Sequence, residues 1–320
     1  MLEITKINPP ATLELVRQNI LKYKNPLGLK GRELTSWAEG LEFSSDSEYL
    51  FYTGTEYQML PYLDSLVKAL KTMNHLGSGK KILYGLRNMV DKLGFNPEKV
   101  YAGILAKDKE KTRDILRKHV LILKALGIKP QYLGEEEWYA GALLYEYGYE
   151  NDVIEIAKNL ANTLKERKIT KIITASPHAA EMLREIYPKF TEFPFKVYTM
   201  AEFLKENLER LPLNNLHQKF VIHDPCRLAR ELGVFSEIRD IIHKTTSAQI
   251  IESQQSGRFT TCCGGATKLL FPELAEALAK QRVKELETLG EVIITACPYC
   301  YFNLSQQSNL PVRDLTEILV

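Results

Sequence analysis

The first 225 residues of this 320-residue chain contain no cysteine, and its five cysteines all lie in the last third. An odd number excludes a framework in which every cysteine is paired in a disulfide. Such a framework is also not expected in a cytoplasmic protein, where thiols are kept reduced. The thiols that need another explanation are Cys226, Cys262, Cys263, Cys297 and Cys300.

The chain also lacks an excess of charge and a long apolar segment. Its 42 lysines and arginines nearly balance its 40 aspartates and glutamates, for a net charge of +2, so electrostatic binding of nucleic acid or an anionic membrane is not expected. The longest apolar runs, such as 292–294, are far shorter than the ~20 residues that span a bilayer. The first ten residues lack the apolar core of a secretory signal. These absences predict a cytoplasmic protein with no membrane span and no nucleic-acid partner.

Short runs rich in valine and isoleucine alternate with helical patterns along most of the chain. This alternation is typical of βαβ units, and it predicts an α/β protein with parallel sheets. The near-continuous apolar character of the strands indicates that helices cover both faces of the sheets. The predicted strands are 48–54, 99–103, 130–133, 171–176, 219–223, 248–252 and 291–296, and the predicted helices include 11–23, 114–127, 235–244 and 273–290.

Two parts of the sequence repeat each other. The segment ITASPHA at 173–179 aligns without a gap with ITACPYC at 294–300, and 139–141 aligns upstream with 262–264. The period of about 120 residues is too long for a solenoid repeat. The repeat therefore predicts two related lobes that face each other.

Each cysteine follows a predicted strand or begins the next helix, which is where open α/β sheets form their binding crevice. Several interpretations of the five thiols stay open. Cys297 and Cys300 can form a redox dithiol, but three cysteines then have no role. A structural zinc ion takes four thiolates and leaves one over. Alternatively, the five are buried free cysteines that pack as small apolar residues and have no chemical role. An iron–sulfur cluster fits best, because neighbours such as Cys262 and Cys263 can bind different irons.

The spacing Cys226-x35-Cys262-Cys263-x33-Cys297-x2-Cys300, with its HDPC and CCGG segments, resembles that of the CCG cysteine-rich domain. This domain occurs in the B-type subunit of heterodisulfide reductase, in its fused homologues, and in iron–sulfur subunits of glycolate-, lactate- and glycerol-3-phosphate-oxidising enzymes. The resemblance implies two tandem, pseudo-symmetric CCG lobes with short parallel sheets flanked by helices. It also implies that the five cysteines are the ligands of one non-cubane 4Fe-4S cluster, with zinc as the alternative.

The first lobe departs from this motif, because other residues stand where a complete domain has its cysteines. Without a thiolate, this lobe cannot hold the family cluster. One complete motif beside a degenerate one resembles the subunits of sulfur-oxidising heterodisulfide reductase-like complexes. The substitutes are Thr55 (or Ile104, if the insertion is placed differently), Tyr139, Ala140, Ser176 and Ala179.

The resemblance divides the chain into three parts and implies a function. Residues 1–47 are a helical arm or linker, 48–210 the degenerate CCG domain, and 211–320 the CCG domain that carries the cluster. The implied function is that of an iron–sulfur redox subunit of a heterodisulfide reductase-like complex, which binds and reduces or oxidises a thiol or disulfide substrate. Two alternatives stay open: an electron-transfer subunit of a glycolate, lactate or glycerol-3-phosphate dehydrogenase complex, and a zinc-stabilised assembly subunit without redox chemistry.

Partners are expected because the chain has neither a ferredoxin cysteine pattern nor a Gly-x-Gly-x-x-Gly loop. The resemblance implies a flavin-binding A-type subunit together with a ferredoxin-type C-type subunit of the heterodisulfide reductase-like complex. It implies a lipoate-carrying protein as a further partner.

Four more residues are candidates for the site. His223 precedes Cys226 and is a candidate hydrogen-bond donor or proton carrier, or a histidine that only ends the strand. Arg227 is a candidate to offset the charge of a cluster or to bind a carboxylated substrate, or an ordinary surface cation. Tyr139 and His178 are candidates for a substrate pocket that faces the cluster, and aromatic packing into the vacated volume is the alternative.

One complete ligand set predicts one cluster. Protein purified without oxygen should contain about four irons and four acid-labile sulfides per chain. One zinc ion without iron would contradict this prediction and favour the assembly subunit. Iron for two clusters would show that the first lobe had been misread.

Overall fold

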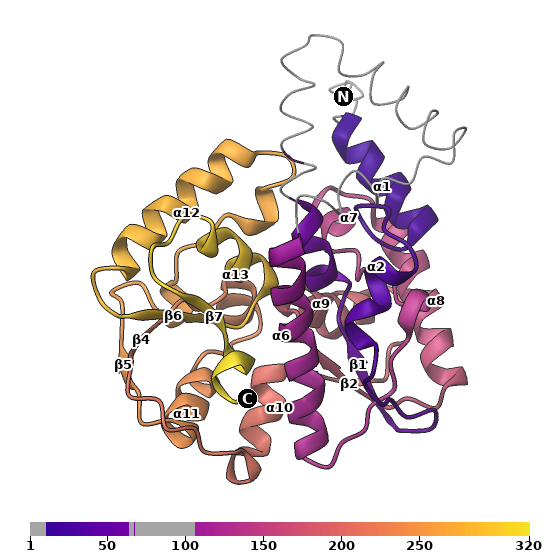
Figure 1. The fold of residues 1–320 in the computed structure, drawn as a ribbon. Helices are drawn as coiled ribbons and strands as arrows, with labels where there is room; N and C mark the ends of the chain where they lie inside the picture. The colour runs from indigo at the N-terminus through magenta and orange to yellow at the C-terminus, as the bar shows by residue number, and fades with distance from the viewer. Residues whose placement is uncertain (1–10, 64–66, 68–105) are drawn as a thin grey trace.

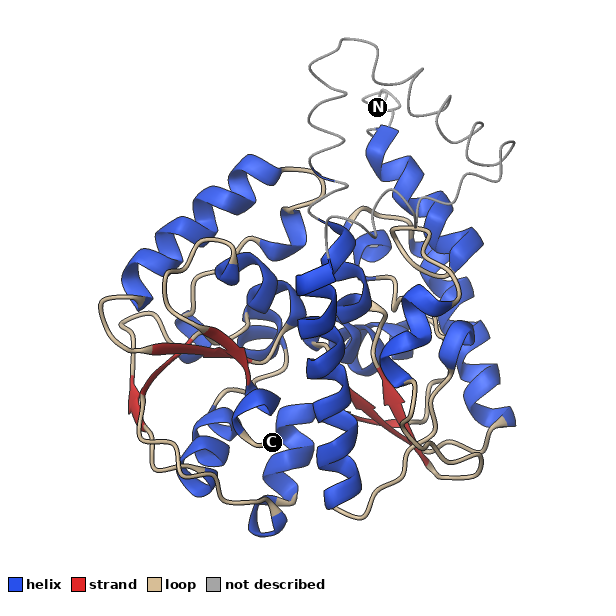
Figure 2. Cartoon of the chain, viewed as in Figure 1, coloured by secondary structure: helices blue, strands red, loops and turns tan. Residues whose placement is uncertain are grey.

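The structure, a computed structural model, describes residues 11–63, 67 and 106–320 and contains two parallel sheets (Figure 1). The first has the strand order β1-β2-β3 and the second the order β5-β4-β6-β7, and neighbouring strands run parallel. Helices surround both sheets (Figure 2), which confirms the predicted α/β class. The strands are β1 (Tyr49–Tyr52), β2 (Lys171–Thr174), β3 (Lys196–Thr199), β4 (Lys219–Ile222), β5 (Gln249–Ile251), β6 (Val292–Thr295) and β7 (Val312–Asp314).

The longer helices bury one apolar face against the sheets. In α8, Val153, Ile156 and Leu160 recur at helical spacing and are buried. Glu150 and Asp152 lie in its first turn, where acidic side chains complement the helix dipole. The α-helices are α1 (Ala11–Tyr23), α2 (Arg32–Thr35), α6 (Ala106–Ala125), α7 (Ala142–Glu146), α8 (Glu150–Glu166), α9 (Pro177–Glu181), α10 (Met200–Glu206), α11 (Ser236–Thr245), α12 (Pro272–Leu286) and α13 (Pro298–Ser305), and the 3₁₀ and π segments are η1 (Ser36–Ala38), η2 (Gly134–Glu136), η3 (Met182–Ile186), η4 (Tyr187–Lys189), η5 (Leu208–Arg210), η6 (Arg227–Glu231), η7 (Gly257–Phe259), η8 (Gly265–Thr267) and η9 (Leu315–Ile318).

Across the described ranges, no helix combines the length and the apolar character that crossing a membrane requires.

The two sheets repeat one arrangement, in agreement with the repeat in the sequence. Ile173 of β2 pairs with Phe51 of β1, and its counterpart Ile294 of β6 pairs with Ile222 of β4. The strands that correspond to each other therefore have the same neighbours and the same register. We call the segments predicted as 48–210 and 211–320 the first lobe and the second lobe; their boundaries stay a prediction.

Local features repeat as well. Thr199 at the end of β3 and Asp314 at the end of β7 each cap the next helix in a reciprocal capping box. Gly141 and Gly264 both have a left-handed backbone, with φ of 83° and 75°. That conformation favours glycine, which explains why both copies of the repeat have glycine there.

The predicted strand at 130–133 is wrong. Only Gln131 pairs, in a single bridge with Leu50 of β1, at the place that β5 occupies beside β4 in the second lobe. Pro130 has no N–H to donate, and the chain enters η2 at Gly134, so little extended backbone remains. The predicted strand at 99–103 lies outside the described residues.

The sequence pattern does not predict β3 and β7. The two strands read KVYT and VRD, so each is short, and the first has one charged residue and the second has two. Each is ordered by pairing with an inner strand, β3 with β2 and β7 with β6. Periodicity within so few residues carries little information.

The two sheets pack against one shared apolar core. In Figure 1, α6 lies between the sheets; it packs against η9, and α10 packs against α11. This cluster joins the lobes, while the other face of each sheet packs in a separate cluster. Members of both sheets in the shared cluster are Phe51, Ile173, Phe220, Ile222 and Ile294.

We expect Tyr57→Phe to weaken the contact between the lobes. Tyr57, in the helix that follows β1, is fully buried and donates a 2.5 Å hydrogen bond from its hydroxyl to Oδ2 of Asp314. The substitution leaves this buried oxygen without that donor, so the free energy of unfolding should fall by about 1–3 kcal/mol in chemical denaturation. Tyr145→Phe is the control, because the Tyr145 hydroxyl makes no hydrogen bond to the described residues. Equal losses in the two variants would contradict the expectation.

Candidate metal centre

The five cysteines come from three segments at one edge of the second sheet. Cys226 follows β4 and precedes η6, while Cys297 follows β6 and precedes α13, in whose first turn Cys300 lies. Since β4 and β6 are neighbouring parallel strands, their carboxyl ends meet at the same edge. Cys262 and Cys263 reach this edge from the loop between η7 and η8.

The thiols form one continuous set. Sγ of Cys263 lies 3.2 Å from Sγ of Cys300, and Sγ of Cys226 lies 3.8 Å from Sγ of Cys262. Cys262 and Cys263 are neighbours in the chain and so join these two pairs, and Cys297 stands three residues before Cys300 at the start of α13. Cys226 and Cys262 are half-buried and the other three are buried, so the set is more accessible at the end formed by Cys226 and Cys262.

Crowding shifts the pKa values of these thiols in opposite directions. Hydrogen bonds from Cys262 and Cys300 lower the pKa of Cys263 to about 6 despite its burial. The pKa of Cys300 is raised because its proton is held in the hydrogen bond to Cys263, and the hydrogen bond with Cys262 raises the pKa of Cys226. The lowered pKa favours the thiolate form of Cys263, which is the form that binds metals.

The cysteine loop lies directly against α13. The N–H groups of Gly264 and Gly265 donate to Sγ of Cys262 and Cys263 at 3.3 and 3.4 Å. A Cβ atom on Gly265 would lie 2.6 Å from Cβ of Tyr299, so only glycine permits this approach. Five converging sulfurs with backbone donors fit an iron–sulfur cluster, whereas a tetrahedral zinc ion would leave one sulfur unused.

His223 is fully buried beside the thiols. One of its ring nitrogens lies within 4.8 Å of Sγ of Cys263 and Cys300. Nδ1 accepts a 3.2 Å hydrogen bond from Nε of Arg282, so the neutral ring carries its proton on Nε2, which has no partner in the described part of the chain. Burial, and secondarily the charge of Arg282, lowers the pKa of His223 to about 3. A neutral ring with one free N–H favours the predicted donor over the predicted proton carrier.

Arg227 connects the two lobes. Its guanidinium donates to both carboxylate oxygens of Glu181 at 3.0 Å and also to Glu146. Both carboxylates belong to the first lobe. Because these donors are already engaged by protein carboxylates, the geometry argues against the predicted contact of Arg227 with a carboxylated substrate.

Asp224, Arg239 and Asn303 hold the cysteine segments in place, and of these Arg239 and Asn303 are missing from the sequence-based site. Asp224 accepts hydrogen bonds from Arg239 at 2.7 and 2.9 Å and from the N–H of Gly257 at 2.6 Å, which ties the end of β4 to the cysteine loop. Asn303 of α13 donates a 2.6 Å hydrogen bond to the carbonyl of Cys263. The HDPC segment is a signal for Asp224, but Arg239 and Asn303 lie in helices without any local signal.

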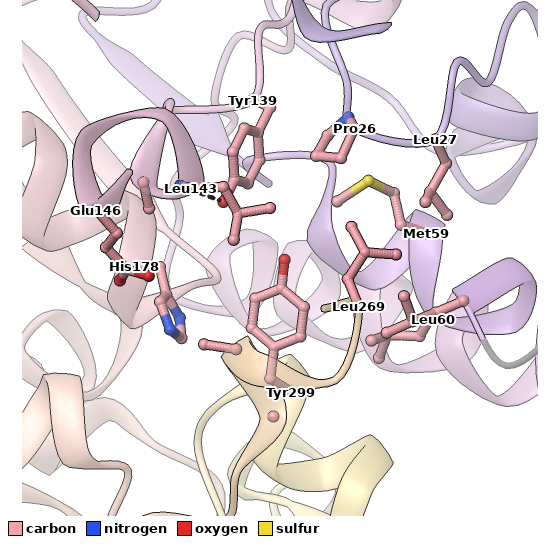
Figure 3. A pocket seen from close by; sticks show the side chains of 14 residues that line it. Pro26, Leu27, Met59, Leu60, Tyr139, Leu143, Glu146, His178, Leu269 and Tyr299 are labelled. Atoms are coloured by element: carbon pink, nitrogen blue, oxygen red, sulfur yellow. Dashed lines mark hydrogen bonds between the residues drawn. The ribbon is translucent and has the colours of Figure 1, made fainter. Parts of the chain in front are cut away.

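A partly open pocket lies between the lobes, next to the cysteine segments; its empty space, including the part open to solvent, is about 510 Å³, and we call it the cavity. Figure 3 shows Tyr139, His178 and Tyr299 on its wall. Tyr139 and His178 are the residues predicted for a substrate pocket, and the structure brings them together here. Gly265, whose N–H binds Cys263, also lines the cavity, so one wall adjoins the thiols. The other lining residues are Glu146 and the mostly apolar Pro26, Leu27, Met59, Leu60, Leu63, Ala142, Leu143, Ala266 and Leu269.

The register of the sheets identifies the first-cysteine position of the degenerate lobe. Phe51 of β1 corresponds to Ile222 of β4, and four residues further along the chain stand Thr55 and Cys226. Thr55 therefore occupies the position of Cys226, which favours it over the alternative at Ile104. Ile104 itself lies outside the described residues.

Aromatic side chains fill the volume around the vacated positions of the first lobe. Tyr52 and Tyr187, both fully buried, donate their hydroxyl hydrogens to the carbonyls of Trp138 and Ala140. Tyr139 is also buried and accepts a 3.2 Å hydrogen bond from the N–H of Leu143. The predicted substrate pocket and the alternative of aromatic packing therefore do not exclude each other, because Tyr139 contributes to both.

The profile of the CCG family, described as "Cysteine-rich domain", matches residues 105–184 and 220–305, which are more than half of the chain. The chain belongs to the CCG cysteine-rich domain family. The second CCG match begins at β4, whereas the first begins after β1, the counterpart of β4.

Relatives of this CCG protein include oxidoreductase subunits. The D subunit of the dihydromethanophenazine:CoB--CoM heterodisulfide reductase of Methanosarcina barkeri is 31% identical over 214 residues, which cover 62% of this chain and 52% of that protein. A Bacillus subtilis protein named "Probable iron-sulfur-binding oxidoreductase FadF" is 27% identical over 211 residues, which cover 62% of this chain and 30% of that protein. The chain thus spans about half the length of the first relative and less of the second.

Among solved structures, the aspartate racemase of Picrophilus torridus is 14% identical, with a TM-score of 0.34, over 65% of this chain and 85% of that one. This likeness is too weak to carry an argument.

We expect Gly265→Ala to weaken metal binding without unfolding the chain. The added Cβ would meet Cβ of Tyr299 at 2.6 Å and its carbonyl oxygen at 3.0 Å, which pushes the cysteine loop away from α13. After reconstitution with iron and sulfide, the affinity for metal should fall by about tenfold or more, measured as iron retained against a chelator. Gly134→Ala is the control, because φ there is +61° but an added Cβ meets nothing within 4 Å. Equal iron retention in both variants would argue against a crowded metal site.

Proposed function

We propose that this chain is an iron–sulfur redox subunit that binds a thiol or disulfide substrate at a non-cubane 4Fe-4S cluster. One observation carries the proposal: free cysteines from three segments form a continuous set of thiols, in which Cys263 and Cys300 are 3.2 Å apart. Membership of the CCG family and the names of its relatives support a redox role with an iron–sulfur cluster. The proposed ligands are Cys226, Cys262, Cys263, Cys297 and Cys300.

The cavity between the lobes suits a substrate with an apolar body and a reactive sulfur. Tyr299 and Gly265 join its wall to the cysteine segments, so a sulfur bound at this wall is close to the thiols. The apolar side chains around the rest of the cavity hold the body of the substrate and exclude water. The cluster, when bound, supplies or takes up electrons one at a time.

His223 and Arg227 have supporting roles in this proposal. Because Arg282 keeps Nδ1 of His223 as an acceptor, the Nε2–H group is left to donate to a sulfur of the cluster. Hydrogen bonds to sulfur tune the reduction potential. Arg227 contributes through its charge, which acts on the neighbouring Cys226 to lower its pKa against the larger effects that raise it.

Electrons must be exchanged with other proteins. We infer that the partners are a flavin-binding protein and a ferredoxin-type protein of the same complex, with a lipoate-carrying protein as a further one. The printed name of the Methanosarcina barkeri relative, which is part of a reductase, supports assembly into a complex. The cytoplasm remains our prediction for its location.

An electron-transfer subunit of a glycolate, lactate or glycerol-3-phosphate dehydrogenase complex is the second candidate. Such a subunit passes electrons between other proteins and needs no substrate site on this chain. The cavity beside the thiols therefore favours the first candidate. A zinc-stabilised assembly subunit is favoured least, because zinc uses four of the five sulfurs.

Cys263→Ser tests the ligand set and the reaction together. Cys263 is buried and its Sγ lies 3.2 Å from Sγ of Cys300, so its loss should remove or convert the cluster and change the visible and EPR spectra. With a chemical one-electron donor, the wild type should reduce a small aliphatic disulfide and the variant should not. Thr261→Ser, two positions before Cys263, is the control and should leave both the spectra and the rate unchanged. An unchanged spectrum in Cys263→Ser would remove Cys263 from the ligand set.

A further inference from the structure

Glu56 is a fully buried carboxyl group in the first lobe. It follows Thr55, the residue in the position of the first cysteine. Its Oε2 accepts a 2.5 Å hydrogen bond from Oγ of Ser176, which stands in the position of Cys297. Its Oε1 has no hydrogen-bond partner among the described residues. The degenerate lobe thus holds an incompletely bonded acid in the region from which the thiols are missing.

His178 connects this acid to the cavity. Its Nδ1 lies 3.8 Å from Oε2 of Glu56 and is buried without a hydrogen-bond partner in the described ranges. Its ring forms part of the cavity wall and meets the ring of Tyr299 edge to face, with centroids 5.0 Å apart (Figure 3). Tyr299 stands between Cys297 and Cys300, so His178 lies between the acid and the cysteine segments.

The surroundings keep a proton on Glu56 and off His178. Burial raises the pKa of Glu56 to about 8, because the hydrogen bond from Ser176 offsets only part of the effect and the charge of Glu146 adds to it. Burial, and secondarily the charge of Arg227, lowers the pKa of His178 to about 3. At neutral pH the pair is a protonated carboxyl beside a neutral imidazole. The titratable and charged groups that face the pair are Tyr52, Tyr139, Glu146, Arg227 and Tyr299.

We propose that Glu56 and His178 form a proton relay for sulfur chemistry in the cavity; this inference rests on the proposed function. Reduction of a disulfide breaks one S–S bond, takes up two electrons and two protons, and releases two thiols. The electrons come from a one-electron donor protein, and a cluster held by the five cysteines would carry them to the substrate. One proton passes from His178 to a departing thiolate while Nδ1 of His178 takes the proton of Glu56, and the other proton comes from solvent. Oxidation of two thiols reverses these steps.

The arrangement of Glu56 and His178 allows a proton to pass in either direction. The 3.8 Å separation between Nδ1 and Oε2 is longer than a hydrogen bond, but such contacts are often long before substrate binds. Nδ1 of His178 has no hydrogen-bond partner among the described residues, and neither has Oε1 of Glu56, which carries the acid proton because Oε2 accepts from Ser176. Ser176 holds the carboxyl in place from the other side.

Glu56→Gln tests the relay, because glutamine keeps an oxygen for Ser176 but has no proton to transfer. Cluster-loaded, full-length protein is given a small aliphatic disulfide and a chemical one-electron donor. In the wild type, thiol release should slow as the pH rises through about 8, because Glu56 then loses its proton. In Glu56→Gln the rate should be about 100-fold lower and should lose this pH dependence, while the iron content and the midpoint potential stay unchanged.

Glu137→Gln is the matched control. Glu137 is another buried carboxyl of the first lobe, its pKa is raised to about 7 by burial, and it is bound by Thr53 away from the cavity lining. This variant should keep the wild-type rate and pH profile. Infrared difference spectra add a readout that does not depend on turnover: the carboxylic-acid band that titrates near pH 8 should be absent from Glu56→Gln and present in Glu137→Gln.

The outcomes separate the relay from the proposed function. A Glu56→Gln variant with the wild-type rate and pH profile, or one that keeps the infrared band, overturns the relay alone. A cluster-loaded wild type that reduces no disulfide overturns the proposed function, and the relay with it. A slow, pH-independent Glu56→Gln beside a normal Glu137→Gln supports both.

Discussion

The candidate centre depends on the parallel pairing of β4 with β6. These strands pair from Phe220 with Val292 to Ile222 with Ile294, and both are almost wholly buried. Neighbouring parallel strands end at the same edge, so the pairing brings Cys226 and Cys297 together although they are far apart in the sequence. The connection from β5 to α12 then has to pass this edge, which delivers the cysteine pair to the same place. An antiparallel or unpaired arrangement of these strands would separate the thiols.

A second constraint fixes the cavity. The sheets of both lobes share one apolar core, and Arg227 in the second lobe is bound by Glu146 and Glu181 in the first. Polar contacts between the lobes, such as the hydrogen bond from Tyr57 to Asp314, fix how the two lobes are oriented in this packing. The wall made by His178 and the wall made by Tyr299 therefore stay in contact only while both lobes are in place. The cavity is a property of the whole chain and cannot be assigned to one CCG repeat.

The sequence predicts those features that depend on residues close together in the chain or on the internal repeat. Strand and helix patterns predict the α/β class, cysteine spacing predicts a common site, and the repeat predicts the equivalence of Ser176 with Cys297. Other features depend on contacts between distant segments. The bonds of Asp224 to Arg239 and of Asn303 to the cysteine loop arise only when the chain folds. The short β3 and β7 are ordered by neighbouring strands. Beside β1, the single bridge at residue 131 takes the place that the strand β5 has beside β4, so the arrangement is kept although almost no strand forms there.

Glu56 shows the limit of reading the degenerate lobe as a vacated site. If the only need were to fill volume, apolar side chains would be sufficient, and Tyr52, Tyr139 and Tyr187 already fill much of it. Burial of a carboxyl with one unbonded oxygen costs free energy, even when the group is neutral. In the second lobe, the corresponding position is Arg227, whose charge is compensated by two carboxylates. The first lobe buries Glu56 with one oxygen unbonded, and next to it stands His178, whose Nδ1 also lacks a hydrogen-bond partner among the described residues. Such unfavourable burial of titratable groups beside a cavity is typical of functional sites.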